Sequence, residues 1–348
     1  MAANASSRAG PRDLAQLNDV LTAPDAETMA GASALKGDLL ILGAGGKMGP
    51  SLALLAQRSV TAAGLPYRVR CVSRFSTPEV TDELTAAGID VIRADLLQPG
   101  ALEALPDAPN VIFLVGMKFG STGAEPQTWM LNTHLPGLVA RRFSAARIVA
   151  LSTGNVYPLV PVTSGGATEQ TPPAPRGDYA QSCLGRERMF QYGALTFGTP
   201  VALLRLNYAN DLRYGVLHDI AQRVLAGETI DLSMGNFNAI WQGDANRVIL
   251  RAFSICASPA RILNLTGPET ISVRWAAEQF GEIFGRAPVF AGAESGQAFL
   301  SNAAECHGLF GYPRVSLADM VAWTAAWIES GGPSLSKPTH FETRDGKY

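Results

Sequence analysis

Short apolar runs alternate with helix-like stretches over most of the region 37–204. Six of these runs have the length and composition of strands: 38–43, 67–73, 88–95, 110–116, 147–152 and 199–207. Strands that alternate with helices in this way predict a parallel sheet with right-handed crossovers. The expected fold class is therefore α/β, with a doubly wound parallel sheet formed mainly by residues 37–204.

The alternation loosens after about residue 205. Three amphipathic stretches are typical of helices, over 215–227, 272–285 and 316–328. We expect residues 205–330 to form a smaller α/β lid that binds the substrate and is interleaved with the last elements of the main domain.

Both ends of the chain lie outside these two regions. Residues 1–36 form a helical extension in which Leu14, Leu17, Val20 and Leu21 recur at helical spacing and Pro24 ends the pattern. We expect this helix to lie on the domain surface, with an oligomer contact as the alternative. Residues 331–348 contain Gly, Pro, Ser and Lys, which predicts a loose tail.

Composition excludes several classes of protein. The 348 residues are 17% charged and 47% hydrophobic, with a formal net charge of −2, which favours neither nucleic acid nor a membrane surface as partner. No apolar run reaches the roughly 18 residues of a membrane span. The beginning of the sequence has no apolar signal segment, so we expect a cytoplasmic protein.

The four cysteines form no CxxC pair and the four histidines have no ligand spacing, so we expect reduced thiols and no metal.

A glycine-rich turn lies directly between the first strand and the helix that follows it. In ILGAGGKMGPS, Gly43, Gly46 and Gly49 flank Lys47 and Met48. Glycine allows a tight turn and a close approach of the backbone to a pyrophosphate, and the helix N-terminus offers N–H groups to the same anion. The strand–turn–helix context predicts a Rossmann-type dinucleotide-binding domain.

The second strand predicts which dinucleotide is bound. Sites for NAD usually place an acidic residue after this strand, whereas this chain has Ser73 and Arg74. An arginine there fits the 2′-phosphate of NADP, and Lys47 could add a second positive charge. The alternatives are a solvated arginine, a solvated lysine at the helix start, and NAD as cofactor. Asp95, next to Leu96, fits an acceptor for the adenine amine, or else a simple loop acid.

Further motifs follow in a characteristic order: GMKFG after the fourth strand, STGNVYP after the fifth, Tyr179 at the start of a helix, LRLNYAN, WQGDAN and NLTGPETISV. With these motifs, residues from about 37 to 330 resemble the extended short-chain dehydrogenase/reductases of the NAD-dependent epimerase/dehydratase family. The resemblance implies the fold given above. It does not identify the substrate.

The resemblance also implies roles for individual residues. Thr153, with Ser152 as the alternative, takes the position of the hydroxyl that bonds the substrate oxygen. Tyr179 takes the position of the acid/base, and Asn132 matches the Asn that often accompanies them. Gly116 and Lys118 match the segment near the cofactor.

One residue departs from the family pattern. The lysine expected four residues after the tyrosine is replaced by Cys183, and no lysine occurs between residues 119 and 336. A phenol titrates near ~10, so a tyrosine base needs a nearby cation. A thiol cannot supply one, and we interpret Cys183 as a buried apolar residue. Arg186 and Lys118 are the candidate substitutes.

These residues predict an NAD(P)-dependent oxidoreductase or epimerase that acts on a sugar, sugar nucleotide or related hydroxy or carbonyl compound. Reduction does not require Tyr179 to be ionised, because a neutral phenol is already a proton donor. The alternative is a dinucleotide-binding sensor or scaffold with impaired catalysis. Gly154 and Asn155 replace the acidic pair of dehydratases, so dehydration is disfavoured.

The segment LNYANDLRYG should shape the substrate cleft, where open α/β folds bind ligands. Its candidate contacts to hydroxyls or phosphate are Asn207, Tyr208, Asn210 and Arg213, with loop structure and capping as the equal alternative. By resemblance to the same family, the helices that begin near 127 and 179 would form a homodimer.

Overall fold

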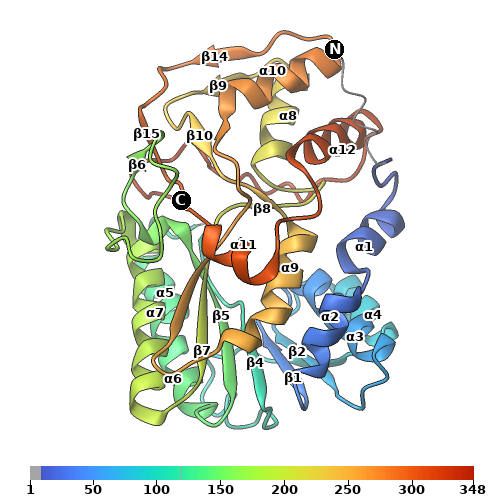
Figure 1. The fold of residues 1–348 in the computed structure, drawn as a ribbon, viewed down its shortest axis with the longest axis vertical. Coiled ribbons are helices and arrows are strands. Elements are labelled where there is room, and N and C mark those ends of the chain that lie inside the picture. The colour runs from blue at the N-terminus through green and yellow to red at the C-terminus, as the bar shows by residue number, and fades with distance from the viewer. Residues whose placement is uncertain (1–8, 119) are drawn as a thin grey trace.

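The structure, a computed structural model, describes residues 9–118 and 120–348. A seven-stranded parallel sheet forms its centre, in the order β12-β7-β5-β4-β1-β2-β3 (Figure 1). The strands are β1 (Leu39–Leu42), β2 (Val69–Ser73), β3 (Asp90–Arg93), β4 (Asn110–Phe113), β5 (Arg147–Thr153), β7 (Val201–Leu206) and β12 (Arg261–Leu265). All six predicted strands are confirmed. The seventh, β12, lies in the segment that contains the NLTG motif.

Helices cover both faces of the sheet (Figure 1). Adjacent side chains of a strand point to opposite faces, so β1 places Leu39 and Ile41 in one core and Leu40 and Leu42 in the other. The helices of the first face are α2 (Ala26–Ser33), α3 (Gly49–Ala62) and α9 (Gln242–Arg251), and those of the second are α6 (Leu135–Arg142) and α7 (Gly177–Phe197). The strands are consequently apolar on both faces, as a parallel sheet between two helical layers requires.

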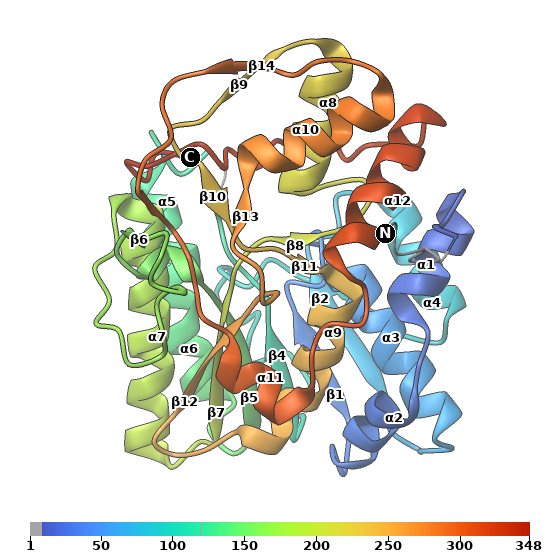
Figure 2. The same cartoon turned by 45° about the horizontal axis from the view of Figure 1, so that its top comes forward.

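A smaller unit lies over the carboxyl edge of the sheet (Figure 2). Its helices are α8 (Val216–Ala226), α10 (Val273–Phe284) and α12 (Leu317–Glu329). Four short strand pairs accompany them: β6 (Val160–Pro161) with β15 (Gln297–Ala298), β8 (Ala209–Asn210) with β11 (Ile240–Trp241), β9 (Thr229–Asp231) with β14 (Val289–Ala291), and β10 (Asn236–Phe237) with β13 (Ile271–Ser272). Trp241, Phe280 and Trp327 are buried in its core. This unit corresponds to the expected lid.

The remaining elements have at most 9 residues each. They are α1 (Leu14–Thr22), α4 (Pro78–Ala86), α5 (Glu125–Trp129), the π-helix Met130–His134, the 3₁₀ turns Gly154–Val156 and Ala252–Ile255, and α11 (Ala304–Phe310). Within the described ranges, no helix combines the length and apolarity that a bilayer-spanning segment requires.

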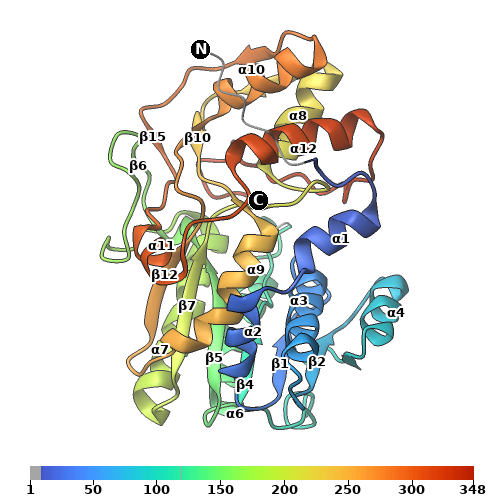
Figure 3. The ribbon, with the colours of Figure 1, turned by 45° about the vertical axis from the view of Figure 1, so that its right-hand side comes forward.

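The N-terminal extension is helical, as predicted, but it is more deeply packed than a surface helix. Leu17 and Leu21 of α1 are fully buried in the lid core, while α2 contacts α3 and α9 (Figure 3). Asp25 caps α2 through a reciprocal bond with Thr28. The extension therefore joins the lid to the main domain.

The tail, residues 331–348, is packed rather than loose. Thr339 donates its backbone N–H and its hydroxyl to Asp219 of α8, at 2.7 and 2.6 Å, and the Phe341 ring is buried in the lid core. Arg344 donates to the carbonyl oxygen of Gln297 at 2.9 Å. The chain ends at the junction of the lid and the sheet (Figures 1 and 3). Composition predicted a loose segment here because it does not reveal which partners the fold places beside it.

Candidate functional site

A cleft of about 390 Å³ lies where the lid meets the carboxyl edge of the sheet. Its walls include the glycine turn after β1, residues 114 and 116–118 after β4, residues 151–153 and 155 at the end of β5, and residues 206–209 after β7. Parallel strands bring these segments together because their carboxyl ends share one edge. The cleft opens next to the point where the strand order reverses, between β1 and β4.

The glycine turn has the geometry that a dinucleotide pyrophosphate needs. Gly43 has φ of +88°, and a Cβ there would lie 2.7 Å from the backbone nitrogen of Val115. A Cβ on Gly49 would collide with the carbonyl of Ala44. No side chain caps the first turn of α3, so its N–H groups and dipole face the turn. The residues present therefore fit the phosphates of a dinucleotide.

A second hollow of about 270 Å³ adjoins the other side of the glycine turn. Ser73, Arg74, Asp95 and Leu96 line it, as expected for the adenosine half of a dinucleotide site. Asp95 also accepts a bond from the backbone of Leu97 at 3.1 Å, the loop role given above as the alternative. These residues follow β2 and β3, in the order that the sequence predicted.

Lys47 does not line this second hollow. Its side chain enters the main cleft instead, with Nζ 3.3 Å from the centroid of the Tyr214 ring. The prediction that Lys47 adds a positive charge beside Arg74 is therefore wrong. The Lys47 ammonium group lies in the main cleft. Burial and the nearby ammonium groups of Lys118 and Lys337 lower the pKa of Lys47 to about 7.

Thr153 and Tyr179 meet in the main cleft. Thr153 ends β5, and its Oγ1 accepts the backbone N–H of Asn155 at 3.2 Å. Tyr179, in the first turn of α7, lines the same cleft. Burial raises the pKa of Tyr179 well above 10, although the Arg186 guanidinium and the Thr153 hydroxyl act in the opposite direction. The phenol is consequently neutral, and at neutral pH it can donate a proton.

Ser152 has a different role from Thr153. Its hydroxyl donates to Glu187 at 2.6 Å, and Glu187 also receives two bonds from Arg205, at 2.9 and 2.6 Å. Both members of this ion pair are buried. The pair fixes β5 and β7 against α7 and engages the Ser152 hydroxyl, whereas Thr153 bonds Asn155.

Arg186 supplies a cation where the family lysine is missing. It projects from α7 into the cleft, donating Nη1 to the Leu151 carbonyl at 2.7 Å and Nη2 to Asn132 Oδ1 at 2.9 Å. Nε is buried without a hydrogen-bond partner in residues 9–118 and 120–348. A ribose hydroxyl would satisfy this donor, which is a second respect in which the cleft fits a dinucleotide.

Asn132 is buried and does not line the cleft. Its Oδ1 accepts from the backbone of Met117 and from Arg186, both at 2.9 Å, and its Nδ2 donates to Met117 O and to Ser182 Oγ. It lies in the π-helix Met130–His134, an irregularity often found at functional sites. Asn132 thus connects the loop after β4 to α7.

Cys183 is buried next to Tyr179 in a small apolar cluster with Val156, Tyr157 and Ala167. Burial raises the pKa of the Cys183 thiol, so it is neutral and is no substitute for an ammonium group. This agrees with its interpretation as a small buried residue.

The substrate candidates divide into two pairs. Asn207 and Tyr208 line the cleft. Asn210 lies outside it, where its Nδ2 donates to Tyr208 O at 2.8 Å and its Oδ1 accepts the N–H of Leu217. Arg213 also lies outside and forms a bidentate pair with Asp211, at 2.7 and 3.2 Å. In the structure, Asn210 and Arg213 therefore bond within their own loop, which is the alternative role given above.

Several residues at the site had no predicted role of their own. Tyr214, Gln242 and Lys337 line the cleft. Tyr348 reaches the site from the tail, where its hydroxyl accepts a bond from Asn155 Nδ2 and its ring meets that of Tyr179. Tyr214 belongs to the segment LNYANDLRYG and Gln242 to the WQGDAN motif, whereas Lys337 and Tyr348 belong to a segment without any motif.

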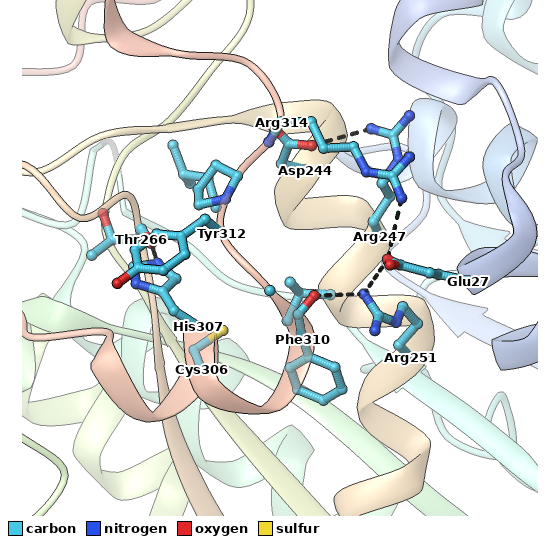
Figure 4. A pocket seen from close by; sticks show the side chains of 14 residues that line it. Glu27, Asp244, Arg247, Arg251, Thr266, Cys306, His307, Phe310, Tyr312 and Arg314 are labelled. Carbon is cyan, nitrogen blue, oxygen red and sulfur yellow. Dashed lines mark hydrogen bonds and ion pairs between the residues drawn. The ribbon is translucent and has the colours of Figure 1, made fainter.

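Another pocket, of about 80 Å³, lies between α2, α9 and α11 (Figure 4). Its arginines pair with acids of the same region: Arg251 contacts Glu27 at 2.8 Å, and Arg314 contacts Glu27 at 3.2 Å. Asp244 accepts the backbone N–H of Arg314. These pairs join the N-terminal extension to α9, so we assign the pocket a structural role. The described part of the chain contains no cluster of His, Cys, Asp or Glu that could hold a metal.

The family model for the NAD dependent epimerase/dehydratase family matches residues 39–232, more than half of the chain. The chain belongs to this family. The matched range includes the glycine turn, Thr153, Tyr179 and Cys183. None of the curated proteins matches the chain significantly.

Solved structures share the fold of this family member. UDP-glucuronic acid 4-epimerase from Bacillus cereus, in complex with UDP-glucuronic acid and NAD, has a TM-score of 0.70 and 20% identity, over 84% of this chain and 99% of that one. UDP-glucose 4-epimerase from Thermus thermophilus, with NAD, has a TM-score of 0.67 and 20% identity, over 83% and 97%. MoeE5, in complex with UDP-glucose and NAD, has a TM-score of 0.69 and 19% identity, over 85% and 99%. The extended short-chain dehydrogenase/reductase fold is thereby confirmed.

Proposed function

We propose that the protein is an NAD(P)-dependent oxidoreductase that reduces a sugar-like carbonyl compound, with Tyr179 as the proton donor. The observation that carries this proposal is the convergence of Thr153, Tyr179 and Arg186 on a cleft next to the glycine turn. The solved neighbours hold NAD with UDP-sugars, which supports a nicotinamide dinucleotide and a sugar-like substrate for this chain.

The chemistry follows from the protonation state of the phenol. When bound, the cofactor supplies the hydride. Thr153 orients the substrate oxygen through its hydroxyl, and Tyr179 donates a proton to that oxygen, so the carbonyl becomes an alcohol and the phenol becomes a phenolate. Arg186 stabilises the phenolate, since a nearby cation favours the ionised form. Epimerisation needs the same groups for an oxidation and for a reduction. In the oxidation Tyr179 must act as a base, and its raised pKa disfavours the base form.

NADP is the proposed form of the cofactor, with NAD as the alternative. Arg74 is exposed at the rim of the hollow that Ser73 and Asp95 also line, and no acid follows β2 to bind a ribose 2′-hydroxyl. Calorimetric titration should give a lower dissociation constant for NADPH than for NADH, and Arg74→Ser should remove most of that difference. Equal affinities in the unmodified protein would contradict NADP preference.

A homodimer is proposed through the segment that contains α5, the π-helix and α7. Large apolar side chains are exposed there, among them Trp129, Met130, Tyr192 and Leu195. A second copy of the chain would bury them, as the family resemblance implies. Light scattering should give twice the chain mass, and Leu195→Glu should reduce it to one. A monomeric unmodified protein would exclude this assembly.

The test of the proposed function combines binding with turnover. We expect the protein to bind NADPH and to oxidise it in the presence of a member of a panel of sugars, sugar acids and nucleotide sugars. Tyr179→Phe should lower kcat by about 10²-fold or more, because general acid catalysis contributes on that scale. Tyr192→Phe, at an exposed tyrosine of the same helix, is the matched control.

The outcomes separate the two functions considered. An unchanged rate in Tyr179→Phe would contradict the role of the phenol. Cofactor binding with neither oxidation of NADPH nor epimerisation of any member of the panel would favour the sensor or scaffold instead.

A further inference from the structure

The main cleft has an unusual balance of charge. Four cationic side chains line it, those of Lys47, Lys118, Arg186 and Lys337, and the described lining includes no carboxylate. The pyrophosphate of a bound cofactor would place roughly two negative charges at the glycine turn. The cations therefore exceed what the cofactor requires, which indicates a further anionic ligand.

Three of these cations form what we call the lysine cluster: Lys47, Lys118 and Lys337. They come from three separate segments, the glycine turn, the loop after β4 and the tail. Lys118 Nζ donates to the carbonyl oxygen of Thr339 at 3.3 Å, and this bond holds the tail segment against the cleft. All three line the same cleft, and repulsion from Lys118 and Lys337 contributes to the lowered pKa of Lys47.

The cluster faces the lid side of the cleft. Lys47 Nζ lies 3.3 Å from the centroid of the Tyr214 ring, and Lys118 Nζ lies 5.6 Å from that of Tyr208. Both tyrosines belong to the segment after β7 that lies at the entrance to the lid. Lys118 Nζ is also 5.9 Å from the centroid of the Tyr179 ring. The cluster is thus beside the proton donor, where substrate is expected, and extends beyond the backbone cradle for the pyrophosphate.

Two carboxylates that act on Lys47, those of Asp211 and Asp219, also have partners of their own. Asp211 forms its bidentate pair with Arg213, and Asp219 accepts two bonds from Thr339. These acids raise the pKa of Lys47, but desolvation and the neighbouring ammonium groups outweigh them. Like charges grouped in a partly buried cleft are costly unless an anion joins them.

We propose that the lysine cluster is a subsite for an anionic group of the substrate, a carboxylate or a phosphate. The inference rests on the proposed function and specifies its substrate class: an acidic sugar or a related acidic carbonyl compound, rather than a neutral one. The tail contributes Lys337 to this subsite and so takes part in substrate selection.

Matched pairs of ligands test the proposal by calorimetry on the full chain saturated with NADPH. The pairs are glucuronate with glucose, glucose 6-phosphate with glucose, and UDP-glucuronic acid with UDP-glucose. At least one acidic member should bind about tenfold or more tightly than its neutral partner, because hydrogen bonds to charged groups are worth that much. The first two pairs distinguish carboxylate from phosphate.

Variants of single lysines test whether the preference for acidic ligands comes from the lysine cluster. Lys337→Met should reduce the preference for the acidic ligand to about threefold or less, without loss of NADPH binding. Lys347→Met removes the same charge from an exposed site in the same tail and should leave the preference intact. Circular dichroism of each variant, with retained NADPH affinity, verifies that it is folded.

Three results would overturn the inference. Equal binding of acidic and neutral members in every pair, with NADPH still bound, would refute the subsite and leave the proposed function standing. If Lys337→Met weakened UDP-glucose and UDP-glucuronic acid equally, the cluster would serve the nucleotide diphosphate instead. Failure to bind NADPH at all would refute the proposed function together with the inference.

Discussion

The ring of Tyr348 meets the ring of Tyr179 edge-on, with 5.3 Å between their centroids and 79° between their planes. Asn155 donates to the Tyr348 hydroxyl, and Ser121 and Thr122 donate to its carbonyl oxygen at 3.3 and 3.2 Å. The end of the tail therefore covers one side of the proton donor, and it is held there by residues that follow β4 and β5.

Removal of this cover should change the ionisation of the phenol. Burial is the main cause of the raised pKa of Tyr179, and Tyr348 also raises it. Tyr348→Ala admits water to the phenol, so the pKa of Tyr179 should fall toward 10. NMR titration of ¹³C-labelled tyrosine, with Tyr179→Phe for assignment, measures the shift. Tyr348→Phe keeps the ring and should change the pKa less; an equal shift in both variants would contradict the role of the ring.

Arg186 should act through its charge. In Arg186→Met the phenolate loses its cation, and Asn132 and Leu151 each lose a donor. We expect kcat to fall about tenfold or more, with a further rise in the pKa of Tyr179. Arg186→Lys retains the cation and should recover part of the rate.

The comparison of these two variants decides between charge and structure. A purely structural role would leave the pKa of Tyr179 unmoved in Arg186→Met and would affect both variants alike. Circular dichroism and NADPH affinity, measured in parallel, identify any variant that fails to fold.

Cys183 should be dispensable for the reaction. It is a buried neutral thiol in an apolar cluster, so Cys183→Ala removes packing but no charge. The free energy of unfolding should decrease by about 1–2 kcal/mol, and kcat should remain within about threefold of the unmodified enzyme. Urea denaturation and steady-state kinetics measure the two effects. A loss of activity beyond tenfold in a folded variant would indicate that the thiol participates.

The lysine cluster should make stability depend on pH. Burial is the largest cause that lowers the pKa of Lys47 to about 7 and that of Lys118 to about 8, from 10.5. Between roughly pH 7 and pH 8 the unfolded chain therefore binds more protons than the folded chain, so the free energy of unfolding should rise with pH. At higher pH the opposite contribution grows, because burial raises the pKa of the Cys71 thiol to about 12 and the unfolded thiol ionises first.

Urea denaturation across this pH range provides the measurement. Besides Lys118, the charged groups that act on Lys47 are Lys337, Asp211 and Asp219. Lys47→Met should flatten the dependence, whereas Lys347→Met, at the exposed site, should not. A stability that decreases from pH 7 to pH 8 in the unmodified protein would show that Lys47 keeps an ordinary pKa.

The sequence by itself determined the parallel sheet and the half of the site that lies in its loops. Apolar runs of strand length specify β1–β5 and β7. The glycine turn, Ser73, Arg74 and Thr153 lie at strand ends, and Tyr179 lies at the start of α7. This information is local: each residue is defined by its distance from a strand or by its position in a short motif. The strand ends then share one edge of the sheet, so local order suffices to place these groups together.

Only the tertiary structure decided which charges and rings meet in the cleft. Lys47 lies in the glycine turn, yet its side chain extends toward Tyr214, and Lys337 and Tyr348 arrive from a tail without any motif. Asn132 has the expected position in the chain but points into the protein, toward Met117 and Arg186. Such contacts join residues separated by tens to hundreds of positions, and side-chain direction is set by packing, which a local sequence pattern does not contain.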